Sequence, residues 1–259
     1  ERLIMHSYQP PLEDFNFILH DFLKIEKEDI KGYNDLLPEF TRTIFEEAGK
    51  LASEVISPSN KDGDEQGCKL ENGIVRTPDS FKLAFDKLRE GGWLSLDIET
   101  EFGGQNLPLI LSMVTNEMFT SANMSLTMYS GLSRGAYSAI FLHGSEEQKQ
   151  LYLPKLASCE WTGTMNLTEP HCGTDLGLIR TKATPCGDGS HQVSGQKIFI
   201  SSGDHDLSKN IIHLVLAKTP DALEGVKGIS LFVVPKFLVH DNGSLGERNN
   251  LSVGKIEKK

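Results

Sequence analysis

The chain has 259 residues and a formal net charge of −10, with 26 Lys and Arg against 36 Asp and Glu. This acidic balance, together with the lack of a basic stripe, argues against a nucleic-acid partner. A hydrophobic content of 38% allows a sizeable buried core, arranged as one large or two ordinary domains.

The cysteines and the first residues of the chain are the features from which we infer the cellular compartment. The four cysteines are widely spaced and form no CxxC pair, which indicates a reduced protein of the cytoplasm or of an organelle matrix. No apolar run approaches the roughly 20 residues that a membrane-spanning helix needs. Residues 1–6 have neither a signal-peptide layout nor a starting Met, so we interpret the sequence as a fragment.

The first half of the chain predicts helices. Residues 1–33 read as an N-terminal extension, in which Phe15, Ile18, Leu19 and Phe22 have helical spacing. Asn34 or Asp35 can cap the next helix, whose apolar stripe runs from Leu36 to Val55. Pro58 and the polar run from Asn60 to Gly67 are expected to end it.

Further helices complete a predicted α-helical domain over residues 34–160. Pro78 starts one helix, and Gly91 and Gly92 stop it. Leu109 to His143 is apolar on most sides and predicts a helix pair buried on several faces, with its methionines as core fillers. Ser145, followed by acidic residues, reads as the N-cap of the last helix.

Composition changes at about Glu160, and residues 161–259 predict a β-domain. Short runs rich in β-formers read as strands: Thr181 to Thr184, His191 to Ser194, Lys197 to Ser201, Ile211 to Lys218 and Gly228 to Val234. The turns between them are too short for crossover helices, which favours an antiparallel sheet or small barrel. The fold class is therefore α+β. No GxGxxG motif follows a strand, so a nicotinamide Rossmann site has no support.

The stretch from Thr164 to Ser202 carries the most specific chemistry. Its first turn is dense in donors and hydroxyls: Gly173 permits a close backbone approach, Pro170 stiffens the turn, and Thr168 and Thr174 can donate and accept. If Lys197 to Ser201 is a strand, Phe199 and Ser201 share a face, as an aromatic platform and a hydroxyl. This combination suits a flat cofactor with polar edges.

These residues resemble the flavin-binding signature of the acyl-CoA dehydrogenases. Thr168-Glu169-Pro170, Gly173-Thr174-Asp175 and Phe199-Ile200-Ser201 occupy the places of that signature. Asn166 stands where a small residue or Cys is usual, Cys172 where a smaller residue or Asn is usual, and Phe199 where many members have Trp. The resemblance extends over essentially the whole chain and looks nearest to a branch that includes 3-methylmercaptopropionyl-CoA dehydrogenase.

The resemblance implies an α-helical domain, a middle β-barrel and a C-terminal four-helix bundle, of which the bundle is absent from this chain. It implies FAD as cofactor, held by the backbone of Met165, Asn166, Leu167 and Thr168, by Gly173 and Thr174, and by Phe199, Ile200 and Ser201. Thr174 would also contact the acyl-CoA, Phe199 would pack against the ring, and Ser201 would bond near flavin N5. The resemblance also implies that Glu169 would support the turn rather than act as the base.

The activity implied by the resemblance is α,β-dehydrogenation of an acyl-CoA thioester. A carboxylate removes the α-proton, and a hydride passes from the β-carbon to flavin N5. That base is expected beyond residue 259, so no catalytic residue is assigned here. Electron-transfer flavoprotein is the expected external acceptor, and the full-length protein is expected to be a homo-oligomer.

The sequence leaves two alternative functions and the choice of acyl group open. An acyl-CoA oxidase or nitroalkane-oxidase-like relative would form hydrogen peroxide, and a base-less flavin or acyl-CoA binding module would carry out no reaction. The acyl group is open between 3-methylmercaptopropionyl and a short-to-medium aliphatic chain. No metal site is predicted, because the histidines and cysteines show no recognised ligand spacing.

Overall fold

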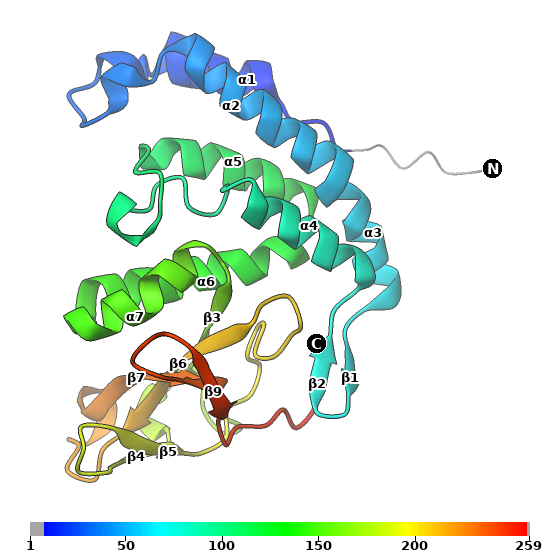
Figure 1. Cartoon of the computed structure of the whole chain (residues 1–259). Coiled ribbons are helices and arrows are strands. Elements are labelled where there is room, and N and C mark those ends of the chain that lie inside the picture. The colour runs from blue at the N-terminus through cyan, green and yellow to red at the C-terminus, as the bar shows by residue number, and fades with distance from the viewer. Residues whose placement is uncertain (1–7, 258–259) are drawn as a thin grey trace.

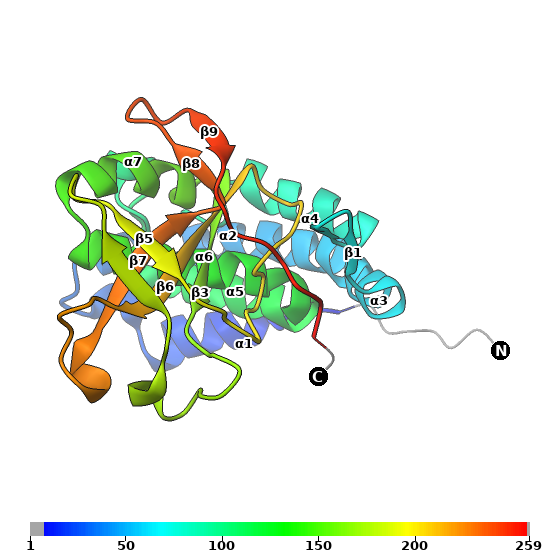
Figure 2. The same ribbon diagram turned by 90° about the horizontal axis from the view of Figure 1, so that it is seen from below.

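The computed structural model describes residues 8–257, and the N-terminal residues 1–6 considered above lie outside this range. Figure 1 shows helices stacked in tiers above a smaller sheet, with α1 and α2 farthest from the sheet and α6 and α7 next to it. Figure 2 shows the same sheet from below, in front of the helices. The predicted order of a helical domain followed by a β-rich domain is confirmed.

The helical part contains long helices and one small hairpin. Its elements are α1 (Leu12–Asn16), α2 (Pro38–Leu51), α3 (Ser57–Gln66), β1 (Lys69–Glu71), β2 (Ile74–Arg76), α4 (Asp79–Glu90), α5 (Leu109–Ala122), α6 (Met124–His143) and α7 (Glu146–Ala157). A π-helical turn, Phe17–Phe22, extends α1, so the helical spacing predicted there is correct. Phe15 and Leu19 point into the core, whereas Ile18 and Phe22 are exposed.

Residues expected to start or stop helices predicted the ends of α4 and the start of α7 correctly, but not the start of α2. Pro78 precedes α4 and Gly91 follows it, as predicted. Ser145 and Gln148 form a complete capping box at α7. By contrast, α2 begins at Pro38 without a side-chain cap, so the predicted capping by Asn34 or Asp35 is wrong.

Helical structure also continues through Pro58, which was expected to end it. The chain widens into a π-helical turn over Ala52–Ile56 and then resumes as α3. Pro58 therefore lies directly after the π-helical turn, at the second position of α3, and does not end the helical structure.

The helix pair α5 and α6 is confirmed, and its predicted burial on several faces is confirmed for α6, which contributes to two core clusters, but not for α5. Leu111, Met118 and Leu126 are fully buried in the core that the pair shares with α2 and α4. Met113 and Met124 are 59% and 63% exposed, so they do not fill the core of the described chain.

The sheet is mixed rather than a closed antiparallel barrel. Its strands are β3 (Trp161–Asn166), β4 (Lys182–Pro185), β5 (His191–Ser194), β6 (Asn210–Lys218) and β7 (Ile229–Pro235), with a separate pair β8 (Phe237–Val239) and β9 (Leu245–Arg248). β3 runs parallel to β6, whereas β4 with β5 and β6 with β7 are antiparallel. The parallel pair arises because β3 and β6 are separated by β4 and β5, a link long enough to return the chain in the same direction.

One face of β3 packs against helix α6. A Cβ atom on Gly163 would lie 2.3 Å from the Cβ of Ala136, so only glycine allows this approach. Trp161 is 1% exposed in a cluster with Ile212, Leu214, Tyr137 and Leu153. The helices thus fix the position of β3, and with it the turn that follows at residue 167.

No helix within residues 8–257 combines the length and apolar character needed to span a bilayer.

Candidate functional site

The turn after β3 is organised by the carboxylate of Glu169, which is buried. The backbone groups of Glu169 and Cys172 exchange hydrogen bonds of 2.8 and 3.1 Å, which close the turn. The Glu169 side chain accepts hydrogen bonds from the amides of Arg180 and Thr181, at 2.7 and 3.0 Å, and from the Thr181 hydroxyl. The ammonium group of Lys197 lies 2.9 Å from its Oε1.

These contacts keep Glu169 charged. Burial by itself raises the pKa of Glu169, but the hydrogen bonds from Thr181, Arg180 and Lys197 outweigh burial and lower the pKa to about 2. A carboxylate so fully occupied is a support for the turn and not a free base. The predicted supporting role of Glu169 is therefore confirmed.

The segment from Lys197 to Ser201 lies against this turn, but it is not a strand. Lys197 Nζ donates to the carbonyl of Leu167 at 3.1 Å, and the Ile198 N–H donates to the carbonyl of Thr168 at 3.0 Å. Phe199 has a φ of +57°, which a bulky residue rarely adopts. The strand prediction is wrong because hydrogen bonds to the turn replace those of a ladder, so strand alternation no longer places Phe199 and Ser201 on one face.

Thr168 lies between the two parts of the signature. Its carbonyl accepts the Ile198 N–H, and a Cβ on Gly173 would lie 3.2 Å from its Cγ2. Glycine at 173 thus lets the turn close on Thr168. Within residues 8–257, the hydroxyls of Thr168, Thr174 and Ser201 make no hydrogen bond to another side chain or to the backbone. Three hydroxyls therefore stay available to a ligand.

The free edge of β3 adds backbone groups to the same site. β3 pairs with β6 on one side only, and the Gly163 N–H on the other side donates to Ser133 Oγ at 3.0 Å. Alternation places the N–H and C=O of Met165 at that same outer edge. No described residue bonds to the Met165 backbone there. A planar ligand with donors and acceptors along one side can pair with this edge.

Of the predicted site residues, the structure joins Leu167, Thr168, Gly173 and the segment that starts at Lys197. Phe199 is 51% exposed and projects from this segment, while Thr174 is exposed on the turn. The supporting residues Lys197 and Thr181 were missed. Lys197 could have been noticed as a charged residue directly before the apolar run Ile198-Phe199-Ile200. This signal did not extend to Thr181.

Glu169, His171 and Cys172 place their ligand-type atoms within 4.8 Å of one another, a spacing that can suit a metal ion. The donor set argues against one, because Lys197 already supplies the positive charge beside Glu169. His171 Nε2 lies 2.9 Å from the Leu178 carbonyl, which only accepts, so this nitrogen carries a hydrogen and offers no lone pair. The absence of a metal site stays a prediction.

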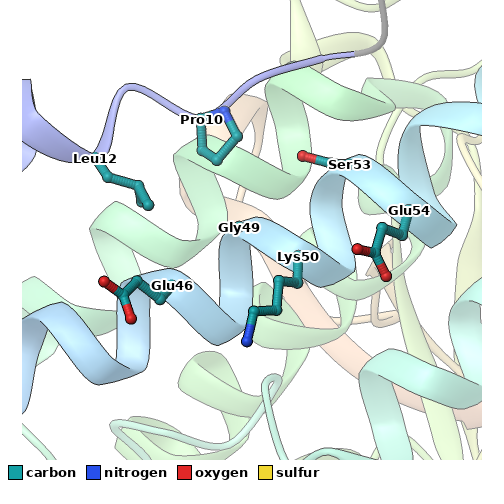
Figure 3. A pocket seen from close by; sticks show the side chains of 7 residues that line it. All are labelled: Pro10, Leu12, Glu46, Gly49, Lys50, Ser53 and Glu54. Atoms are coloured by element: carbon teal, nitrogen blue, oxygen red, sulfur yellow. The ribbon is translucent and has the colours of Figure 1, made fainter.

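A cavity of about 270 Å³ lies elsewhere, where the N-terminal segment crosses the helix formed by α2 and its π-helical extension. Figure 3 shows its lining: Pro10, Leu12, Glu46, Gly49, Lys50, Ser53 and Glu54. This helix is in the tier farthest from the sheet (Figure 1), so the cavity is not part of the candidate site.

Residues 38–160 match the family described as acyl-CoA dehydrogenase, N-terminal domain. The chain is 43% identical over 254 residues to 3-methylmercaptopropionyl-CoA dehydrogenase from Ruegeria pomeroyi, covering 98% of this chain and 43% of that protein. A butyryl-CoA dehydrogenase from Syntrophomonas wolfei is 38% identical, with 98% of this chain and 42% of that protein covered. The chain belongs to the acyl-CoA dehydrogenase family.

Solved structures agree with this membership. An acyl-CoA dehydrogenase from Geobacillus kaustophilus matches with a TM-score of 0.60 and 31% identity, covering 77% of this chain and 48% of that one. One from Bacillus anthracis, complexed with FAD, matches with a TM-score of 0.62 and 25% identity, covering 78% of this chain and 32% of that one. This member of the acyl-CoA dehydrogenase family spans less than half the length of these relatives.

Proposed function

We propose that the full-length gene product is an FAD-dependent acyl-CoA dehydrogenase, with its helical domain over residues 34–160 and its β-domain over 161–259. The observation that carries the proposal is the set of unpartnered groups around Thr168. The free backbone edge at Met165 and the hydroxyls of Thr168 and Ser201 suit a planar ring with a polar rim. Because the chain belongs to the acyl-CoA dehydrogenase family, FAD is the cofactor proposed to supply this ring.

Each residue of this set has a proposed role toward FAD. The backbone of Met165, Asn166 and Leu167, with Thr168 and its hydroxyl, would hold the pyrimidine side of the ring. Gly173 and Thr174 would approach the pyrophosphate, with Thr174 also near the acyl-CoA. Phe199 and Ile200 would cover the ring, and Ser201 would donate to it. When bound, FAD supplies the two-electron acceptor of the reaction, and a carboxylate outside the groups assigned here removes the α-proton.

The substrate proposed is an acyl-CoA thioester, with 3-methylmercaptopropionyl-CoA and butyryl-CoA as the first candidates. The names of the two relatives at 43% and 38% identity support these two acyl groups. We further propose electron-transfer flavoprotein as acceptor, a homo-oligomeric assembly and a cytoplasmic or matrix location. All four cysteines are free thiols, as a reducing compartment requires.

The test uses the full-length gene product, purified and mixed anaerobically with a panel of acyl-CoAs that includes both candidates. Bleaching of the flavin absorbance by one acyl-CoA is the expected result and identifies the acyl group. Thr168→Val should weaken FAD binding by about tenfold, because a hydrogen bond to the ring is lost. Thr184→Val on β4, an exposed threonine, serves as the matched control.

Other outcomes contradict the proposal in distinct ways. Flavin that no acyl-CoA bleaches would favour a binding module without the reaction. Hydrogen peroxide formed in air at the rate of substrate oxidation would favour an oxidase. A full-length protein that binds no FAD would overturn the proposal as a whole.

A further inference from the structure

Three polar residues follow one face of β3 toward the proposed flavin site. Thr162, Thr164 and Asn166 alternate with residues that face helix α6, so their side chains share the opposite face of the strand. His213 on β6 is the register partner of Thr164. This register brings an imidazole beside the Thr164 hydroxyl, two residues before the strand ends at Asn166.

The Thr164 hydroxyl links His213 to Asn166. Thr164 Oγ1 lies 2.6 Å from Asn166 Oδ1 and 2.8 Å from His213 Nδ1. A hydroxyl has one hydrogen, and an amide oxygen can only accept, so Thr164 donates to Asn166. His213 must then donate to Thr164 through Nδ1–H. His213 Nε2 has no partner in the described chain, which fits a bare lone pair.

Burial agrees with this arrangement. His213 is 3% exposed, and burial lowers its pKa to about 4 against the attraction of Asp204. The ring is therefore neutral at pH 7 and has a single hydrogen, which Nδ1 holds.

The reversed arrangement is less favourable. If the Asn166 amide were turned around, its NH₂ group would donate to Thr164, and Thr164 would donate to Nδ1. The single ring hydrogen would then sit on Nε2, buried and without an acceptor. Buried N–H donors without a partner are rarer and costlier than buried acceptors without one.

We propose that His213 and Thr164 are positioning residues that hold the Asn166 amide oxygen inward, so that its NH₂ group presents hydrogen-bond donors to the flavin. This inference rests on the proposed function for its ligand and on the described contacts for the hydrogen-bond chain. Asn166 is only partly buried, and no described residue accepts from its NH₂ group. The donors thus stand at the open end of β3, beside the free Met165 backbone.

His205 provides an internal reference with the opposite ring hydrogen. The Leu207 N–H donates to His205 Nδ1 at 3.1 Å, so this nitrogen is bare. His205 Nε2 then carries the hydrogen and lies 2.9 Å from Thr162 Oγ1. His205 is 1% exposed, and its pKa is likewise lowered to about 4 by burial and by Lys236. His205 and His213 should therefore be opposite tautomers.

The first experiment is ¹⁵N NMR of the histidine rings in the full-length protein at pH 7. We expect the His213 ring to be protonated at Nδ1 and bare at Nε2, and the His205 ring to show the reverse. Thr164→Val should perturb only the Nδ1–H ring, and Thr162→Val, the matched control, only the Nε2–H ring. A His213 ring protonated at Nε2 would overturn the proposal, because Asn166 would then present its oxygen.

The second experiment titrates the full-length apoprotein with FAD and follows the quenching of flavin fluorescence. Asn166→Asp keeps an acceptor for Thr164 but removes both donors, so the Kd for FAD should rise by about tenfold. Thr164→Val should raise it by about threefold, since Asn166 is then free to turn. Thr164→Ser, which restores the hydroxyl, should return the wild-type Kd.

The outcomes separate this inference from the proposed function. If wild-type protein binds FAD and Asn166→Asp binds it equally well, the donor role of Asn166 is overturned while the dehydrogenase proposal stands. If wild-type protein binds no FAD, both the proposed function and the ligand assigned to Asn166 fail. The tautomers of His213 and His205 then still decide whether the hydrogen-bond chain is as described.

Discussion

At the scale of single residues, Glu169 decides whether the signature turn keeps its shape. Glu169→Gln removes the charge that balances Lys197, whose side chain is only 9% exposed. Leaving one partner of a buried ion pair alone should lower the free energy of unfolding by about 3 kcal/mol at pH 7. Denaturant unfolding of both proteins measures this difference.

The same substitution has a defined pH dependence. The pKa of Glu169 is lowered from 4.5 to about 2, so its stabilisation is complete above pH 4.5 and is lost as the pH falls toward 2. The difference between wild type and Glu169→Gln should therefore shrink between pH 4.5 and 2. Glu160→Gln is the control, because Glu160 pairs at the surface with Lys155 and Lys209 and should cost under about 1 kcal/mol. Equal losses for both variants at pH 7 would contradict the role assigned to Glu169.

At the scale of elements, local chemistry made some boundaries predictable and tertiary contacts decided the others. Pro78 and Ser145 act within one helical turn, so α4 and α7 could be predicted from sequence. The prediction of a strand over Lys197 to Ser201 failed because the hydrogen bonds of this segment go to Thr168 and Leu167, about 30 residues away in the chain. The Thr164 and His213 contact was equally hidden, since it depends on a parallel register that no local pattern encodes.

The contact between β3 and α6 gives a prediction about elements. Gly163→Ala would place its new methyl group 2.3 Å from Ala136 Cβ, so α6 must move away from the sheet. We expect a loss of about 1–3 kcal/mol in the free energy of unfolding. Adding Ala136→Gly should recover most of it, which a double-mutant cycle measures as a coupling energy.

The control for this cycle is another glycine in α6. A Cβ atom added at Gly135 would have no neighbouring atom within 4 Å, so Gly135→Ala should stabilise the helix by about 0.5–1 kcal/mol. Strictly additive effects of Gly163→Ala and Ala136→Gly would show that β3 and α6 do not meet as described.

At the scale of the whole molecule, residues 204–206 connect the sheet to the helical part. The Val75 N–H of the β1–β2 hairpin donates to Asp204 at 2.9 Å, and Asp204 forms a buried ion pair with Lys236. The Tyr129 ring of α6 meets the His205 ring edge-on, with centroids 4.9 Å apart. The two parts are thus joined through polar groups that cannot reach water, which makes their joint stability sensitive to protonation.

His205 and His213 determine the sign of this sensitivity to pH. Burial is the main cause that lowers the pKa of His205 and His213 from 6.5 to about 4, so both are neutral when folded and take up a proton on unfolding between these values. The free energy of unfolding should therefore fall as the pH drops from 6.5 toward 4, with a slope approaching two protons, about 2.7 kcal/mol per pH unit. Denaturant unfolding across this pH range measures the slope. His213→Gln should halve it, whereas replacing the exposed His143 by Gln should leave it unchanged. An unaltered slope in His213→Gln would mean that His213 is charged in the folded protein, and the neutral ring that orients Thr164 and Asn166 would then be excluded.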